Sequence, residues 1–173
     1  DPEIVDGILL KHAGTGVSIL AAPARPEQAE KVSAEQFLKI LEFLRQMYAY
    51  IVVDTSAYLS DITLSAIDVS DVIVLITTQE IPSIKSVRLF LDLLHTMGFE
   101  RERIVFMLNR FDKRITITAE RVGENLKQDV VAVLPLEERV VIPAVNRGIP
   151  FMMDGKNQPI ARGIFGLAEN VRA

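Results

Sequence analysis

One short apolar run that ends in a carboxylate constrains the fold of this chain more than any other feature. Residues 50–53 read Tyr-Ile-Val-Val, and Asp54-Thr55-Ser56 follow directly. A run this apolar and rich in β-branched residues predicts a strand buried on both faces, as in a parallel sheet. The carboxyl ends of such strands open into the crevice where ligands bind. Asp54 is therefore predicted either to hold a hydrated Mg²⁺ near a phosphate or simply to cap the segment that follows.

Other apolar runs alternate with segments of helical periodicity. Strands are predicted over residues 17–22, 72–77, 104–108 and 130–134. Helices are predicted over residues 1–11, 33–48, 60 or 61 to 67, 82–97, 116 or 118 to 126, 137–147 and 159–171. Ser33 and Gln36 form a capping-box motif at the start of one of them. The alternation predicts a single α/β domain over residues 1–173, with a mostly parallel, doubly wound sheet flanked by helices.

Composition narrows the classes of protein to which the chain can belong. Hydrophobic residues make up 49% of the sequence, which is enough to build a core. The net charge of -4 argues against a nucleic-acid partner. No cysteine is present, which excludes disulfides and thiolate metal ligands. Every apolar run is far shorter than the roughly 20 residues of a membrane-spanning helix, so no transmembrane segment is predicted.

Polar side chains follow the apolar run at residues 104–108, at the predicted strand end. The first two are Asn109 and Arg110. An Asn amide both donates and accepts hydrogen bonds, so it can pair with the edge of a purine. The flat guanidinium of Arg110 can stack on a base or meet a phosphate. The alternative is that Asn109 only satisfies backbone groups of its own turn.

The next predicted strand ends in a second candidate segment, Pro135-Leu136-Glu137. It lies beside Asn109 if the two strands are neighbours, because parallel strands deliver their carboxyl ends to one edge of the sheet. The backbone of this segment could then frame a base. A plain strand-to-helix turn explains the same residues equally well.

Five sequence motifs stand in one order, and together they suggest a family. They are Ile-Val-Val-Asp-Thr-Ser at residues 51–56, Ser-Asp-Val-Ile-Val-Leu-Ile-Thr at 70–77, Met-Leu-Asn-Arg at 107–110, Val-Leu-Pro at 133–135 and Asn-Arg-Gly-Ile-Pro at 146–150. In this order they resemble the C-terminal two-thirds of the MinD/ParA ATPase superfamily. Within it, residues 18–23, Ser-Ile-Leu-Ala-Ala-Pro, are similar to the CpaE/TadZ branch, which is associated with pilus assembly and polar localisation.

The resemblance implies a role for each candidate residue. Asp54 matches the acid that holds Mg²⁺ and its water shell, and Asn109 and Arg110 match the pair that contacts adenine. Pro135, Leu136 and Glu137 match the loop that borders the base. It also implies a bacterial cytoplasmic protein, peripheral at the membrane or cell pole, that binds ATP and Mg²⁺ and forms a homodimer when intact. The implied partners are an upstream response-regulator receiver-like domain and other pilus or localisation proteins.

The chain departs from this family at the phosphate site. No Gly-x-x-x-x-Gly-Lys-[Ser/Thr] motif occurs in the sequence, and that motif cradles the phosphates. The chain alone is therefore expected to bind neither ATP nor Mg²⁺ tightly and not to hydrolyse ATP. Truncation upstream of Asp1 is the simplest explanation. In the family the P-loop strand lies between the 50–53 and 72–77 strands, so these two are expected to pair directly or to leave an edge that something else fills.

Two other functions stay open at this point. The chain could be a non-catalytic, degenerate ATPase-fold module that serves as a scaffold. It could also bind GTP, since Asn109-Arg110-Phe111-Asp112 approximates the Asn-Lys-x-Asp motif in which the acid reads guanine. In that case Asp112 would be the residue that selects the base.

Overall fold

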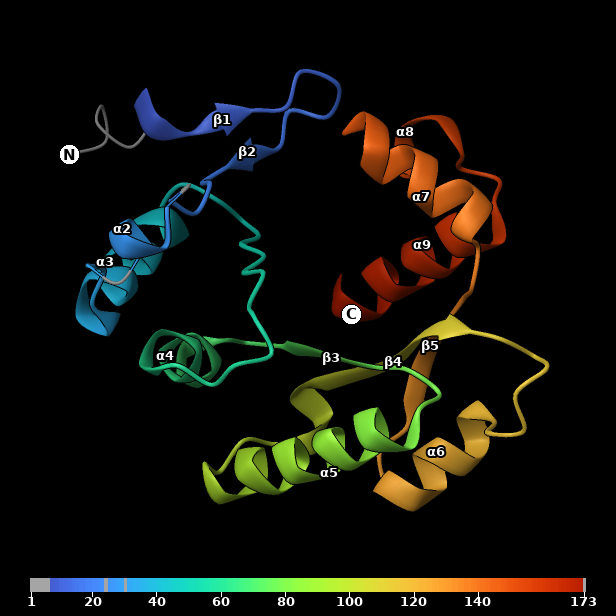
Figure 1. Cartoon of the computed structure of the whole chain (residues 1–173). Helices are drawn as coiled ribbons and strands as arrows, with labels where there is room; N and C mark the ends of the chain where they lie inside the picture. Colours follow the sequence, from blue (N-terminus) through green and yellow to red (C-terminus); the bar gives the residue numbers. More distant parts are fainter. Residues whose placement is uncertain (1–6, 24, 30, 173) are drawn as a thin grey trace. The chain divides into compact units, whose positions relative to one another are not determined.

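The computed structural model describes residues 7–23, 25–29 and 31–172 (Figure 1). The chain forms two compact units, Asp1–Val69 and Ser70–Ala173. The single domain over residues 1–173 stays a prediction.

A parallel three-stranded sheet organises the second unit. Its strands are β3 (Ile73–Thr77), β4 (Ile104–Phe111) and β5 (Val130–Pro135), in the order β3-β4-β5. Ile73 pairs with Ile104 and Thr77 with Leu108, in unbroken register along β3. The three strands predicted in this part of the sequence are therefore confirmed. So is the α/β class with a parallel sheet, because β-branched and other apolar runs of this length bury well between helix layers.

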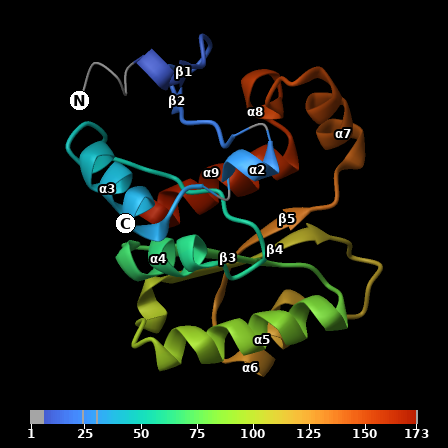
Figure 2. The same ribbon diagram turned by 60° about the vertical axis from the view of Figure 1, so that its left-hand side comes forward.

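Helices cover both faces of this sheet (Figures 1 and 2). On one face lie α5 (Ile81–Thr96) and α6 (Ala119–Leu126), and on the other lies α9 (Pro159–Arg172), which packs on β5. Short elements complete the unit: the 3₁₀ helix η1 (Arg101–Arg103), α7 (Glu138–Arg147) and α8 (Phe151–Asp154). The predicted helices in this unit are confirmed to within about two residues at each end.

Local sequence signals set the ends of these helices. Thr118 caps α6 by accepting a hydrogen bond from the backbone of Arg121. Gly98 and Gly148 follow α5 and α7 with φ angles of 78° and 64°. Left-handed angles of this kind are open to glycine without a Cβ clash, so the helices end there.

The core of the second unit is built around β4. Phe106 and Leu108 are completely buried, and Met107 is nearly so. Met107 packs with Leu134 of β5 and Ile160 of α9 in one apolar cluster. The central strand is thus buried on both faces, which is why its sequence is a continuous apolar run.

The described residues of the first unit include a small hairpin followed by helices. Strands β1 (Leu10–Lys11) and β2 (Ser18–Ile19) pair in antiparallel register. The helices are α2 (Pro26–Ala29), α3 (Ala34–Arg45) and α4 (Asp61–Val69). The capping box at the start of α3 is confirmed: Ser33 Oγ accepts from the Gln36 backbone at 3.2 Å, and Gln36 Oε1 accepts from the Ser33 backbone at 2.9 Å.

Three expectations for the first unit are wrong or only partly right. Residues 50–56 form no strand, and Val52 is 93% exposed. A strand is stable only when a neighbour pairs with its backbone groups, and no described strand pairs with this segment. The strand predicted over residues 17–22 shrinks to Ser18–Ile19 and is antiparallel. The helix predicted over residues 1–11 ends before β1, and its first six residues lie outside the described part of the chain.

Candidate functional site

The candidate site lies where β4 and β5 end. Asn109 and Arg110 occupy an irregularity in β4, because the register between β4 and β5 shifts between Leu108 and Phe111. Arg110 has a φ of 55°, in the left-handed region. Such a conformation costs a non-glycine residue about 1–2 kcal/mol, so the fold holds this turn in place against local strain. Bulges of this kind re-aim side chains at strand ends.

Asn109 uses half of its side-chain amide inside the turn. Its Oδ1 accepts a hydrogen bond from the backbone nitrogen of Arg110 at 2.9 Å. Its Nδ2 has no hydrogen-bond partner among the residues that the structure describes, and the residue is half-buried. The turn-satisfying role considered from the sequence is therefore real, and it leaves the amide N–H donors available to a ligand.

The side chain of Arg110 is only loosely held. One guanidinium nitrogen lies 3.4 Å from Glu138 Oε1, and both side chains are more than half exposed. An exposed pair of this kind contributes roughly 0–1 kcal/mol. The guanidinium can thus leave Glu138 for a base or a phosphate at little cost.

The segment after β5 is joined to the end of β4. The Leu136 backbone nitrogen donates to the Phe111 carbonyl at 2.9 Å, and Pro135 stands opposite Phe111 in the sheet. Glu137 has a structural task, because its Oε2 accepts the backbone N–H of Ile160 at 2.9 Å, at the start of α9. The five residues predicted to surround a base, Asn109, Arg110, Pro135, Leu136 and Glu137, therefore come from two adjacent strand ends, with the Glu137 carboxylate committed to α9.

Gln79, just past the end of β3, is a residue of this region for which no role was predicted. It is only 4% exposed. Its Nε2 donates to the Ile117 carbonyl at 2.6 Å, and its Oε1 accepts from the Asp112 backbone at 2.7 Å. One buried amide thus fixes both ends of the loop that follows Arg110. The only sign of Gln79 in the sequence is that a polar residue directly follows a strand. That sign does not identify its hydrogen-bond partners, which lie more than 30 positions away.

The carboxylate of Asp112 is already engaged. Both of its oxygens accept hydrogen bonds from the Arg114 side chain, and one also accepts the Arg114 backbone N–H at 2.9 Å. These bonds to Arg114 lower the pKa of Asp112 from 3.8 to about 2. A guanine base would have to displace Arg114, which weighs against the GTP alternative.

Asp54 lies in the first unit, exposed within the irregular residues 50–56. No hydrogen bond to its carboxylate is formed within the described part of the chain. It does not act as a helix cap, because Ser60 caps α4 by accepting from the Thr63 backbone. A single free carboxylate suits Mg²⁺, which keeps most of its water and takes one or two protein ligands. Within the described residues no cluster of three or more His, Cys, Asp or Glu side chains could hold a metal by itself.

Comparison with known proteins identifies sequence relatives of this chain. No family model matches the chain. MinD from Thermotoga maritima is 26% identical over 169 residues, which cover 95% of this chain and 62% of that protein. MinD from Bacillus subtilis is also 26% identical, over 85% of this chain and 58% of that protein. The chain is related to the MinD/ParA superfamily of ATPases.

Solved structures from the MinD/ParA superfamily share the fold. A ParA family ATPase from Chlorobium tepidum superposes with a TM-score of 0.86 at 18% identity, covering 99% of this chain and 69% of that one. MinD from Pyrococcus horikoshii, solved in complex with Mg-ADP, superposes with a TM-score of 0.81 at 23% identity, covering 96% and 68%. The chain spans about three fifths of the length of the curated MinD proteins that it matches.

Proposed function

We propose that this chain is the C-terminal part of a MinD/ParA-type, CpaE-like ATP-binding protein that acts in pilus assembly or polar localisation. The observation that carries the proposal is the half-engaged amide of Asn109, presented at the strand ends beside residues 135–137. The relative solved with Mg-ADP supports nucleotide chemistry on this fold.

Each candidate residue has a distinct task in this proposal. The Nδ2 of Asn109 donates to a ring nitrogen of adenine, and the guanidinium of Arg110 stacks on the base or meets a phosphate. The backbone at Pro135, Leu136 and Glu137 borders the base. Asp54 holds the water shell of Mg²⁺, which neutralises phosphate charge when it is bound.

The chain alone is proposed to be inert, because its sequence has no glycine-lysine loop to cradle the phosphates. The intact protein would supply that loop, form a homodimer with nucleotide, and work with an upstream receiver-like domain and with pilus or localisation proteins in the cytoplasm, at the membrane or pole. In the part of the chain that the structure describes, no helix has the length and apolar character needed to cross a membrane.

A non-catalytic scaffold is the second candidate function. Such a module would keep the α/β fold without hydrolysing ATP. A natural full-length protein that also lacks the motif would decide for the scaffold.

The base-binding role can be tested on this chain with weak ligands. Millimolar AMP should shift the backbone NMR signals of residues 109–111 and 135–137, together with the side-chain NH₂ signals of Asn109, and GMP should shift them less. Asn109→Ala should abolish these shifts, whereas Asn170→Ala, whose amide donates to the Gly166 carbonyl of its own helix, should not. AMP shifts that persist unchanged in Asn109→Ala would refute the assignment, and micromolar binding of ATP to the chain would refute its inertness.

A further inference from the structure

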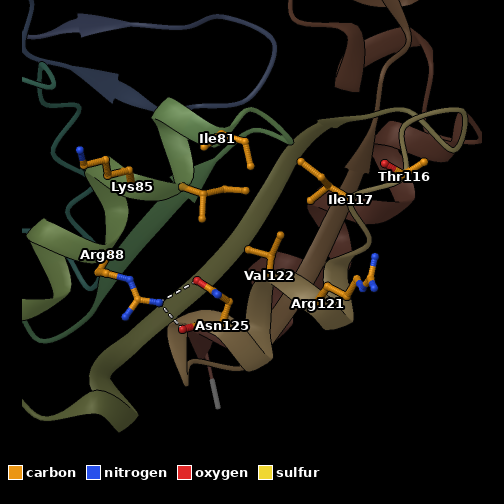
Figure 3. Close-up of a pocket in the computed structure, with 9 residues that line it drawn as sticks. Ile81, Lys85, Arg88, Thr116, Ile117, Arg121, Val122 and Asn125 are labelled. Atoms are coloured by element: carbon orange, nitrogen blue, oxygen red, sulfur yellow. Dashed lines mark hydrogen bonds between the residues drawn. The ribbon is translucent and has the colours of Figure 1, made fainter.

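A groove separates α5 from α6 on one face of the sheet (Figure 3). Its cavity volume is about 470 Å³. The apolar part of its lining comes from Ile81 and Ile84 of α5, Val122 of α6, and Ile117 in the loop before α6. Ile81 is 67% exposed. Apolar side chains left open in a concave surface are typical of an interaction site.

Three cations lie at the edges of this apolar surface, and the side chains of Lys85 and Arg121 extend away from its centre (Figure 3). Lys85 and Arg88 project from α5, and Arg121 projects from α6 (Figure 3). Neither Lys85 nor Arg121 forms an ion pair with any described residue, and no Asp or Glu lines the groove. The groove therefore carries positive charge that nothing in its own lining neutralises, on a chain whose net charge is -4.

Arg88 is held in place rather than left free. One of its terminal nitrogens donates both to the backbone carbonyl of Asn125 and to Asn125 Oδ1, the latter at 2.7 Å (Figure 3). These bonds tie α5 to α6 and fix the guanidinium at the groove, while its other nitrogens keep their donors. Fixing a cation in advance lowers the entropy cost of binding an anionic partner.

We propose that this groove binds an acidic amphipathic segment of a partner protein. Such a segment would place apolar side chains against Ile81, Ile84 and Ile117 and its carboxylates near Lys85, Arg88 and Arg121. A helix that buries one apolar face in a groove recognises its site in this way. The complementary charges would set orientation and association rate. The inference is independent of the nucleotide proposal, because it uses neither Asn109 nor Asp54.

The groove suits an acidic, partly apolar protein segment better than a small anion, a nucleic acid or a lipid bilayer. A phosphate or a small anion would leave the isoleucines in water. A nucleic-acid backbone offers contiguous phosphates but little apolar surface to cover them. A bilayer is an extended surface, whereas this site is a hollow between two helices.

A display selection tests the proposal. Phage would carry 16-residue peptides with Glu fixed on the flanks of a randomised apolar helical face, and would be selected on the wild-type chain. The comparison chain is Lys85→Glu/Arg121→Glu, which reverses two exposed charges. The control is Arg162→Glu, an exposed charge reversal on α9, across the sheet. Circular dichroism confirms that each variant folds.

Enriched peptides should bind the wild type and the Arg162→Glu chain equally, and the double variant at least about tenfold more weakly by fluorescence anisotropy. Their binding should shift NMR signals of α5 and α6. A selection without enriched peptides overturns the proposal, as does equal binding to the double variant. So does binding of a 20-mer single-stranded DNA or of phosphatidylglycerol vesicles at the same residues with greater affinity than the best peptide.

Discussion

Replacing Gln79 by leucine tests whether one buried amide fixes the loop behind the candidate site. The change removes the bonds from Nε2 to Ile117 and from the Asp112 backbone to Oε1. A neutral hydrogen bond contributes about 1 kcal/mol net, and each partner left unsatisfied away from water adds about 1–3 kcal/mol. Since both partners are only partly buried, we expect a loss of about 2–4 kcal/mol in the free energy of unfolding.

Replacing Gln79 by glutamate separates hydrogen bonding from packing. The carboxylate can still accept from Asp112, but when ionised it opposes the Ile117 carbonyl. Burial and the facing carbonyl raise its pKa in the folded state above the ordinary value of about 4.3. A raised folded pKa means that stability is present below the unfolded pKa and is lost as the pH rises through the folded pKa. Gln79→Glu should therefore be mildly destabilised at pH 4 and strongly destabilised at pH 7.

Urea denaturation followed by circular dichroism at both pH values measures these changes. Gln36→Glu is the matched control, because Gln36 is exposed and glutamate keeps the acceptor of the capping box. Its stability should change by less than about 0.5 kcal/mol. The reasoning is refuted if Gln79→Leu is as stable as the wild type, or if Gln79→Glu loses the same stability at pH 4 as at pH 7.

Two further predictions concern packing and acid stability. A Cβ on Gly163 would lie 2.5 Å from Leu134 Cδ2, whereas a Cβ on Gly166 would meet nothing within 4 Å. Gly163→Ala should therefore be less stable than Gly166→Ala by about 1–3 kcal/mol in thermal unfolding. Equal stabilities of the two variants would contradict the close packing of α9. Bonding to Arg114 holds the pKa of Asp112 near 2, so the stability that this pair contributes is present above pH 3.8 and is lost as the pH falls through 2. An NMR titration of the Asp112 carboxyl should give a midpoint near 2 that moves toward 3.8 in Arg114→Ala, and an unmoved midpoint would exclude Arg114 as the cause.

Much of the second unit could be predicted because its signals are local. Continuous apolar runs give β3, β4 and β5, and Thr118, Gly98 and Gly148 set helix ends through groups within a few residues. Signals of this kind can be recognised in a single sequence, because each depends only on residues close together in the chain. The strand ends then follow from the parallel arrangement, which is why the predicted residues at 109–110 and 135–137 come together.

The first unit was harder to predict because its strand depended on a neighbour. Residues 50–53 have the composition of a buried strand, yet they join no sheet in the described chain. Composition shows what a segment can bury, whereas pairing requires a partner strand at the right place. The predicted roles of Asp54 at Mg²⁺ and of Asn109 at the base stay predictions.

The sequence by itself determined the α/β class and the residues at the strand ends, because both follow from residue type and order along the chain. Only the tertiary structure decided that the Glu137 carboxylate caps α9, that Asp112 is occupied by Arg114, and that Gln79 fixes the loop behind β4. It alone brought the cations of α5 and α6 around one groove. The partners of Gln79 lie more than 30 positions away in sequence, and so do the groove residues of α5 and α6 from one another. Folding brings such distant residues together in ways that no local pattern encodes.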